Sequence, residues 1–245
     1  MHDDDRLAVE LTAVVVGGEV ERLTRLLRRH PELATASVVD RNGGVRSPLH
    51  LLADAPGHRP RAAETVRVLV GAGADPEAQA GGMWHTERPL HWAASNDDVL
   101  LIDALLDAGA DLEALGSSID GGPPLSSAVG YGQWHAARRL VDRGGRTELW
   151  HAAALGLLPV VARLTEDATD LDGPLWNACR GGQLATARFL VERGVRPGGW
   201  RRGPAGRRSM PRAPAGTGNS SNGWRRTSAD RVTDRPGTPR DPRPS

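Results

Sequence analysis

Lysine is absent from this chain of 245 residues, and Arg supplies all 31 of its Lys and Arg side chains. Phe and Tyr occur once each, whereas Gly occurs 30 times and Pro 18 times. Because this bias follows GC-rich codons, we expect the gene to come from a high-GC bacterial genome, such as an actinobacterial one. Hydrophobic residues make up only 39% of the chain, so part of it is expected to lie outside any core.

Cysteine and long apolar runs are also scarce. The single cysteine, Cys179, excludes an internal disulfide and any metal site built from several cysteines, and it fits a reducing compartment. The apolar run at residues 13–16 is too short for the core of a secretory signal, and acidic rather than basic residues precede it. We therefore expect a soluble cytoplasmic protein that does not associate with membranes.

Charge is unevenly distributed, although the net charge is only +1. Residues 196–245 contain 12 Arg and three acidic residues, whereas residues 1–195 contain 19 Arg and 27 acidic residues. The C-terminal segment is rich in Gly and Pro and has no apolar periodicity. Such a composition cannot bury enough apolar surface to fold, so we expect residues 198–245 to be a disordered basic tail.

The rest of the chain repeats one pattern. Most copies begin with a pair such as Pro-Leu. Small residues and a second apolar run follow, and the copy ends with residues that include Gly. The copies read PLHWAASNDDVLLIDALLDAGAD (89–111), SPLHLLADAPGHRPRAAETVRVLVGAGAD (47–75), PPLSSAVGYGQWHAARRLVDRGG (123–145), TELWHAAALGLLPVVARLT (147–165) and GPLWNACRGGQLATARFLVERGV (173–195). The interval from the first Leu to the closing Gly is 19 residues in three of them, for example from Leu90 to Gly109. This spacing predicts two short helices in each copy, which must stack on their neighbours to bury their apolar faces.

Pro48-Leu49-His50 and Pro89-Leu90-His91, together with Gly-Ala-Asp at 73–75 and 109–111, resemble the signature of ankyrin-repeat proteins. The resemblance implies an all-α, ankyrin-type repeat solenoid of helix-turn-helix units over residues 7–197. We expect units at about 7–36, 47–75, 88–111, 123–145, 147–168 and 173–195. Where Trp150 and Trp176 replace the signature His, we expect buried aromatic surface to take over its packing role.

Candidate catalytic residues have structural interpretations that we favour. His50 and His91 belong to the repeated signature, which implies a role within and between repeats. Glu148 and His151 have the spacing of a di-iron ligand pair, but no second such pair accompanies them. Cys179 occupies a small-residue position of its unit and is expected in the core. We predict no catalytic residue, no metal site and no cofactor.

The connectors between units are the more informative positions. In the family that the chain resembles, they project as fingers that line a concave face with the first helices. Trp and Arg are common at the centres of protein interfaces. Trp84 either projects in this way or folds back onto its own repeat. The partner-binding candidates are Met83, Trp84, His85, Glu87, Arg88, Leu115, Ser118, Ile119, Tyr131 and Trp134.

The function that these patterns favour is a non-catalytic scaffold for protein–protein interaction, acting as a monomer. One alternative is a nucleic-acid-associated binder that uses the basic tail, whose contacts would depend steeply on salt. An enzyme or an enzyme regulatory subunit is a further alternative, although no phosphate loop or nucleophile with a base supports it.

The tail has a second interpretation. A high-GC back-translation of residues 206–212 encodes Thr-Pro-Leu-Asp-Ala-Ala in another reading frame, which is the start of an ankyrin unit. The Leu of that start would fall 33 residues after Leu175, which is the usual period of the family. We therefore hypothesise that residues 198–245 result from a frameshift.

Overall fold

The computed structural model describes residues 1–82 and 86–195. Contacts divide the chain into Met1–Pro211 and Arg212–Ser245, and every described residue belongs to the first part. The tail predicted for 198–245, with its frameshift hypothesis, lies outside the described residues. The described helices are α1 (Arg6–Val16), α2 (Val20–Arg29), α3 (Pro48–Ala53), α4 (Ala62–Gly71), α5 (Pro89–Ser95), α6 (Val99–Asp107), α7 (Pro124–Tyr131), α8 (Trp134–Asp142), α9 (Leu149–Leu155), α10 (Leu158–Leu164), α11 (Asp172–Arg180) and α12 (Leu184–Glu192), with a 3₁₀ helix at Pro31–Thr35.

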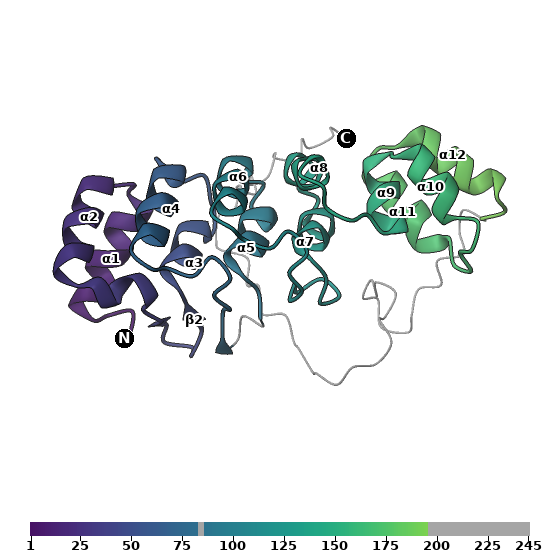
Figure 1. Cartoon of the computed structure of the whole chain (residues 1–245). Coiled ribbons are helices and arrows are strands. Elements are labelled where there is room, and N and C mark those ends of the chain that lie inside the picture. The colour runs from purple at the N-terminus through teal and green to yellow at the C-terminus, as the bar shows by residue number, and fades with distance from the viewer. Residues whose placement is uncertain (83–85, 196–245) are drawn as a thin grey trace, which may run out of the picture. The chain divides into compact units, whose positions relative to one another are not determined.

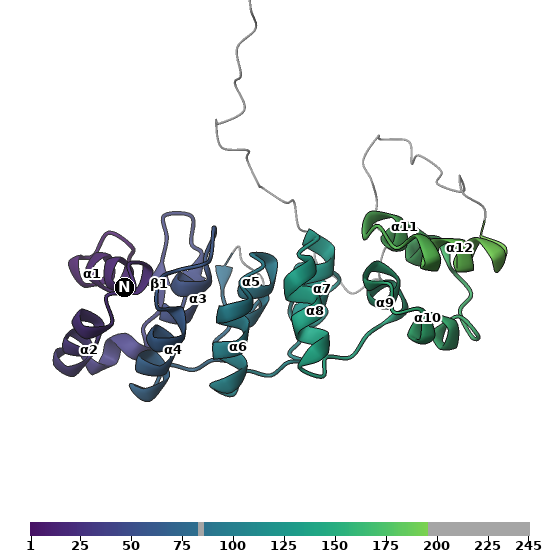
Figure 2. The ribbon, with the colours of Figure 1, turned by 90° about the horizontal axis from the view of Figure 1, so that it is seen from above.

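Consecutive helices form pairs, and the pairs stack in two rows (Figure 1). The first helices α1, α3, α5 and α7 pack on one another in one row, and the second helices α2, α4, α6 and α8 form the other (Figure 2). This is the arrangement expected of helices that each carry one apolar face and cannot bury it alone. No helix of the described part is long and apolar enough to cross a membrane.

The repeated signature places the helix ends. Proline is the first residue of α3, α5 and α7, where its missing N–H costs no helical hydrogen bond. Glycine follows the second helices in a left-handed conformation, with φ of 102° at Gly73 and 96° at Gly109. After Gly109, the backbone N–H of Ala110 donates to the carbonyl of Leu105 at 3.0 Å. This closing bond satisfies a carbonyl at the helix end and turns the chain away from the axis.

The core consists of two clusters. One extends through α1–α8 and includes Ala154 and Leu155 at the end of α9. A smaller one lies within α9–α12 and contains Ala152, Ala153, Val161, Leu175, Ala178, Leu190 and Val195. The stack therefore has a large N-terminal core and a small C-terminal one.

Two short strands interrupt the helices where the sequence predicted only α-helical units. β1 (Val38–Val39) pairs antiparallel with β2 (Val45–Arg46). Between them, the Asp40 carboxylate accepts the backbone N–H groups of Asn42 at 2.8 Å and Gly44 at 3.0 Å. The Asn-Gly step at 42–43, flanked by valines, is the sequence signal for this hairpin.

The connectors between the C-terminal helix pairs are short and contain no such hairpin. Only residues 143–148 separate α8 from α9, and only residues 165–171 separate α10 from α11. Arg180 of α11 links these helices to the preceding stack, because it donates to the carbonyls of Val129 at 2.8 Å and Gly130 at 2.7 Å at the end of α7. Its guanidinium also lies over the rings of Trp134 and Trp176, 5.5 Å and 5.2 Å from their centroids. Burial lowers the pKa of Arg180 without removing its charge.

Two expectations for this region were wrong. Cys179 is exposed rather than buried, because no further helix pair packs on α11 within the described residues. Trp150 and Trp176 are only half-buried, so they do not replace the signature His as packed core, and His151 rather than Trp150 stands at the third helical position that His50 and His91 hold. Instead, Trp150 donates its ring N–H to the Glu148 carboxylate at 2.8 Å and lies against His151.

Candidate binding surface

Three connectors form a set of neighbouring loops that we call the fingers: finger 1 (38–46), finger 2 (80–87) and finger 3 (115–122). Finger 2 is closed by the backbone N–H of Ala80, which donates to the carbonyl of Glu87 at 2.8 Å. Finger 3 is closed by two bonds of 3.0 Å, from Gly116 to Gly121 and from Ser117 to Gly122. Backbone bonds thus close the base of finger 2 and both ends of finger 3.

The fingers also touch one another. Val45 of finger 1 and Gly81 of finger 2 exchange two backbone hydrogen bonds of 3.0 Å. A Cβ on Gly82 would lie 2.0 Å from the carbonyl oxygen of Gly43, and a Cβ on Gly116 would lie 2.5 Å from that of Thr86. Glycine at 82 and 116 therefore lets each finger approach the preceding one.

Two buried histidines support the fingers from below. His50 in α3 and His91 in α5 are fully buried, and each Nδ1 accepts the backbone N–H of the residue that caps its helix, at 3.2 Å and 3.1 Å. The proton then resides on Nε2, which donates to the carbonyl of Glu87 for His50, at 3.1 Å, and of Gly122 for His91, at 3.3 Å. Each histidine therefore ties a first helix to the base of the next finger.

Burial keeps both rings neutral. It lowers the pKa of His50 and of His91 to about 4, although the hydrogen bonds to the finger carbonyls act in the opposite direction. His151 is buried as well, and desolvation lowers its pKa to about 3. Its Nδ1 accepts the Glu148 backbone N–H at 3.1 Å and its Nε2 contacts the Ser126 hydroxyl at 3.2 Å, so the Glu148–His151 pair caps a helix.

Glu87 differs from its prediction as a surface residue. It is only 8% exposed, and its carboxylate accepts the Trp92 ring N–H at 3.2 Å and the backbone N–H of Ser118 at 2.9 Å. Glu87 stands near the finger tip in the sequence, and no sequence signal indicates that the chain folds back at this residue. Glu87 joins finger 3 to finger 2, and we remove it from the candidate surface.

The exposed candidates of finger 3 lie beside α7. Leu115 is 66% exposed and Tyr131 is 43% exposed. The Tyr131 hydroxyl lies 3.1 Å from the Ser118 hydroxyl, which links helix and finger. Ile119 is seated over Gly130, where an added Cβ would come within 2.6 Å of its Cγ1. These four side chains, Leu115, Ser118, Ile119 and Tyr131, form what we call the finger-3 patch.

The other candidates are placed differently. Arg88 is largely covered: it pairs with Glu77 at 2.8 Å, and it donates to the carbonyl of Leu115. Trp134 is half-buried beneath the guanidinium of Arg180. Arg88 therefore supports finger 3 from below, whereas Trp134 packs against the core of the stack. Met83, Trp84 and His85 lie outside the described residues.

One family model matches part of this chain. Residues 85–114 match the family model of the ankyrin repeat. The fold is an ankyrin-type repeat solenoid. The matched range contains α5, α6 and the Gly-Ala-Asp turn, which the other units repeat with variations, and the all-α class predicted from the sequence is confirmed.

Two further comparisons complete the description of this ankyrin-type chain. No curated protein gives a significant match. Among solved structures, the crystal structure of the ankyrin repeat domain of Bcl-3, described as a unique member of the IkappaB protein family, is 26% identical. The alignment covers 76% of this chain and 86% of that chain, with a TM-score of 0.49.

Sequence reasoning missed two residues that shape the surface. Glu77 accepts the backbone N–H of Asp111 at 2.9 Å, and Glu113 accepts that of Arg146 at 2.7 Å. Both glutamates stand two residues after an aspartate that caps their own turn. The repeated Asp-x-Glu after Gly-Ala could have identified them, because the same spacing recurs in consecutive units.

Proposed function

We propose that this chain is a non-catalytic, ankyrin-type scaffold that binds another protein through its fingers and first helices. The observation that carries the proposal is the exposure of Leu115 on finger 3 and of Tyr131 on α7, whose hydroxyl contacts the hydroxyl of Ser118 in the same finger. Large apolar side chains held in place before binding lose little conformational entropy when a partner covers them. Protein surfaces with this property are efficient anchors.

The frame around the finger-3 patch supports the proposal. The backbone N–H of Ser118 donates to the carboxylate of buried Glu87. At the base of finger 3, the Nε2 of His91 donates to the carbonyl of Gly122. The apolar patch is rimmed by the Arg88–Glu77 ion pair, which offers polar groups at its edge. An apolar centre with a polar rim is the usual composition of a protein interface. Met83, Trp84 and His85 at the tip of finger 2 are proposed to extend this surface.

The test compares a patch variant with a matched control. Leu115→Ala/Tyr131→Ala removes the apolar centre, whereas Leu100→Ala removes a leucine that is 76% exposed on α6, in the other helix row. Each full-length variant is used to capture partners from a lysate of the source organism, with melting temperature as a folding control. We expect partner recovery to fall at least about tenfold, or roughly 1.4 kcal/mol, for the patch variant alone. Equal recovery with both variants would refute the proposal.

The same experiment distinguishes the alternative functions. Trp84→Ala is expected to weaken capture and leave the melting temperature nearly unchanged, and a large loss of stability would show that Trp84 is core. Captured nucleic acid that is released steeply with rising salt, irrespective of the patch variant, would favour the 12 Arg of residues 196–245 as the binding element.

A further inference from the structure

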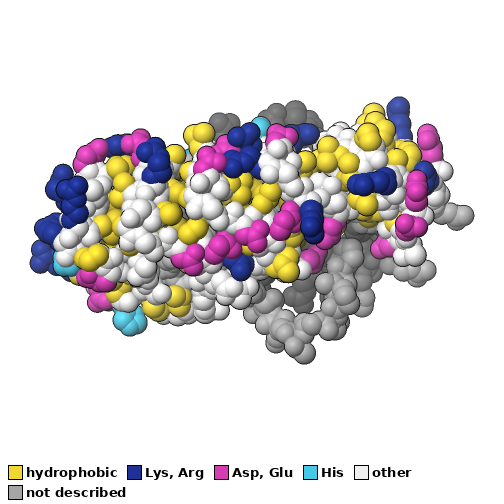
Figure 3. Space-filling view, viewed as in Figure 1, with side chains coloured by type: hydrophobic (Ala, Val, Ile, Leu, Met, Phe, Trp, Pro, Cys, Tyr) yellow, Lys and Arg dark blue, Asp and Glu magenta, His cyan; other side chains and the backbone are white. Residues whose placement is uncertain are grey.

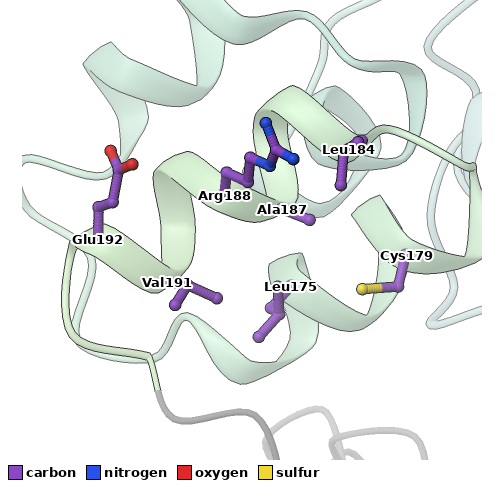
Figure 4. A pocket seen from close by; sticks show the side chains of 7 residues that line it. All are labelled: Leu175, Cys179, Leu184, Ala187, Arg188, Val191 and Glu192. Carbon is purple, nitrogen blue, oxygen red and sulfur yellow. The ribbon is translucent and has the colours of Figure 1, made fainter.

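The last helix pair leaves an apolar groove open. Leu175 and Cys179 of α11 and Leu184, Ala187 and Val191 of α12 line a groove of about 350 Å³ (Figure 4). Leu184 is 64% exposed and Val191 is 38% exposed. Arg188 and Glu192 stand on the α12 side of the groove. We call this surface the α11/α12 face.

Comparison with internal units identifies the α11/α12 face as a stacking surface. Cys179 is exposed, but the residues at its position in preceding units, Ala94 and Val129, are fully buried. Ala187 is half-buried, whereas its counterpart Ile102 in α6 is fully buried. A following helix pair covers the internal positions, and none covers the terminal ones within the described residues.

The charges on α12 occupy positions that pair forward in the stack. Their counterparts in α6 are Asp103 and Asp107, which bind Arg139 and Arg143 of the next second helix at 2.8 Å and 2.7 Å. In α8, Arg138 is the counterpart of Arg188, and it donates to the Leu155 carbonyl of the next first helix at 3.4 Å. A molecule that covers the α11/α12 face should therefore offer an anion to Arg188 and a cation to Glu192.

We propose that the α11/α12 face binds the same face of a second copy of this chain, about a two-fold axis. Arg188 and Glu192 are one helical turn apart on α12. If two α12 helices cross antiparallel with the two-fold axis level with residue 190, midway between Arg188 and Glu192, each Arg188 lies opposite the Glu192 of the other copy. Such a self-complementary patch is what a closed two-fold dimer requires, and the apolar groove residues are buried together.

Other surfaces of the chain fit less well. At the other end of the stack, α1 exposes Val9 by 52% among charged side chains (Figure 3), but head-to-tail stacking on this end would build open chains rather than a mass that stops at a dimer. Residues 196–245 contain 12 Arg but only three acidic residues, so they would satisfy Glu192 more readily than Arg188. A second α12 supplies both charges at the required spacing.

The size of the face sets the expected strength. Two nine-residue helices are each about 13 Å long, and their shared face measures roughly 13 Å by 20 Å. The area of this face is well below the ~800 Å² that each partner buries in a standard stable interface. The dimer is therefore weak, and the monomer predominates in dilute solution.

The first experiment measures the mass of the reduced full-length chain by sedimentation from about 10 μM to about 1 mM. The average mass should rise towards that of a dimer, and the labelling rate of Cys179, the single thiol, should fall several-fold over the same range. Leu184→Asp should abolish both effects, whereas Leu100→Asp on α6 should leave them unchanged. Circular dichroism checks that both variants are folded.

A charge-swap series identifies the occupant. Arg188→Glu and Glu192→Arg should each weaken self-association, because like charges then face one another. An equimolar mixture of these two variants should associate again, since each unlike pair is restored across the two-fold axis. The proposal is overturned by a monomeric mass throughout, by a dimer that survives Leu184→Asp, or by mixed variants that stay apart. Slow labelling of Cys179 already at the lowest concentration would overturn it too, because a segment of the same chain would then cover the face.

Discussion

The stack from α1 to α8 and the four helices from α9 to α12 use the same sequence pattern with different results. In the first region, the connectors at 38–46, 80–87 and 115–122 form fingers, and buried His50 and His91 bind their carbonyls. In the second, the connectors are too short for fingers, and His151 turns to a hydroxyl of the preceding unit. We infer that the histidine of the repeated signature hydrogen-bonds to a finger carbonyl only in units that a finger follows.

The two regions also differ in what their ends leave exposed. The fingers offer a patch that hydrogen bonds from Glu87 and His91 support, whereas the α11/α12 face exposes positions that internal units bury. One surface is suited to a different protein and the other to a further helix pair. If this distinction holds, changes of packing or charge should affect the two regions unequally.

The largest expected effect is the response to acid, and it should appear in both regions, because burial also lowers the pKa of His151 in α9 to about 3. His50 and His91 have folded pKa values of about 4, below the usual 6.5, so the unfolded state takes up protons first as the pH falls. Stability is therefore complete above about pH 6.5 and is lost towards pH 4, by up to roughly 3 kcal/mol for each ring. Urea unfolding as a function of pH measures this loss.

The control for the acid response is His2, which is exposed near the N-terminus. His2→Asn should leave the pH dependence unchanged. His91→Asn should lower stability at neutral pH and reduce the slope between pH 6.5 and 4, because the titrating ring is gone. An unchanged slope in His91→Asn would show that its burial does not control the acid response.

The next effect compares two equivalent core leucines. Leu105 of α6 and Leu190 of α12 are both fully buried and both stand four residues before a closing glycine. Leu105→Ala should lower the free energy of global unfolding by about 2–5 kcal/mol, because the cavity lies in the large N-terminal core, which is expected to unfold as one unit. Leu190→Ala should instead release α11 and α12 locally, which hydrogen exchange would detect. A global loss of equal size in both variants would contradict the division into two cores.

A smaller effect should follow from crowding at finger 3. Gly116 has φ of 135° and approaches the carbonyl of Thr86, whereas Gly121 has φ of 67° and open space around its Cβ position. Gly121→Ala should cost about 1 kcal/mol through backbone strain alone, and Gly116→Ala should cost at least about 1 kcal/mol more. Thermal melts of the two variants test this, and equal costs would mean that the finger contact is not tight.

A more local effect concerns the link between the regions. Arg180→Met should remove two hydrogen bonds to the end of α7 and cost roughly 2 kcal/mol, mainly in the C-terminal helices. Arg180→Lys should restore little, because lysine lacks the forked donors that reach both carbonyls. Arg163→Met, on exposed surface in α10, serves as the control. Hydrogen exchange of α11 would show the loss, and full rescue by lysine would contradict this account of the link.

The sequence predicted the helix pairs well because their signals are local. Proline at Pro48 and Pro89 and glycine at Gly73 and Gly109 mark ends that depend on backbone conformation alone. Burial of Glu87 could not be predicted in this way, because it depends on Trp92 and on Ser118 of the next finger. The exposure of Cys179 depends on whether a further helix pair packs on its unit, and no local sequence pattern indicates whether one does.

The candidate surface was predicted only in part for the same reason. Leu115 and Tyr131 were predicted as partner-binding candidates, and both are exposed in the structure. Arg180, which joins α11 to α7 across some 50 residues of sequence, gave no local signal at all. Long side chains that bridge distant units become visible only when the stack is built.

Hydrogen exchange of the full-length chain at neutral pH and low micromolar concentration tests the central comparison most directly. It reports the opening free energy of each helix separately. The account predicts that amides of α5–α8 exchange only by global unfolding, while those of α11 and α12 exchange through a smaller, local opening. Uniform protection from α5 to α12 would contradict it.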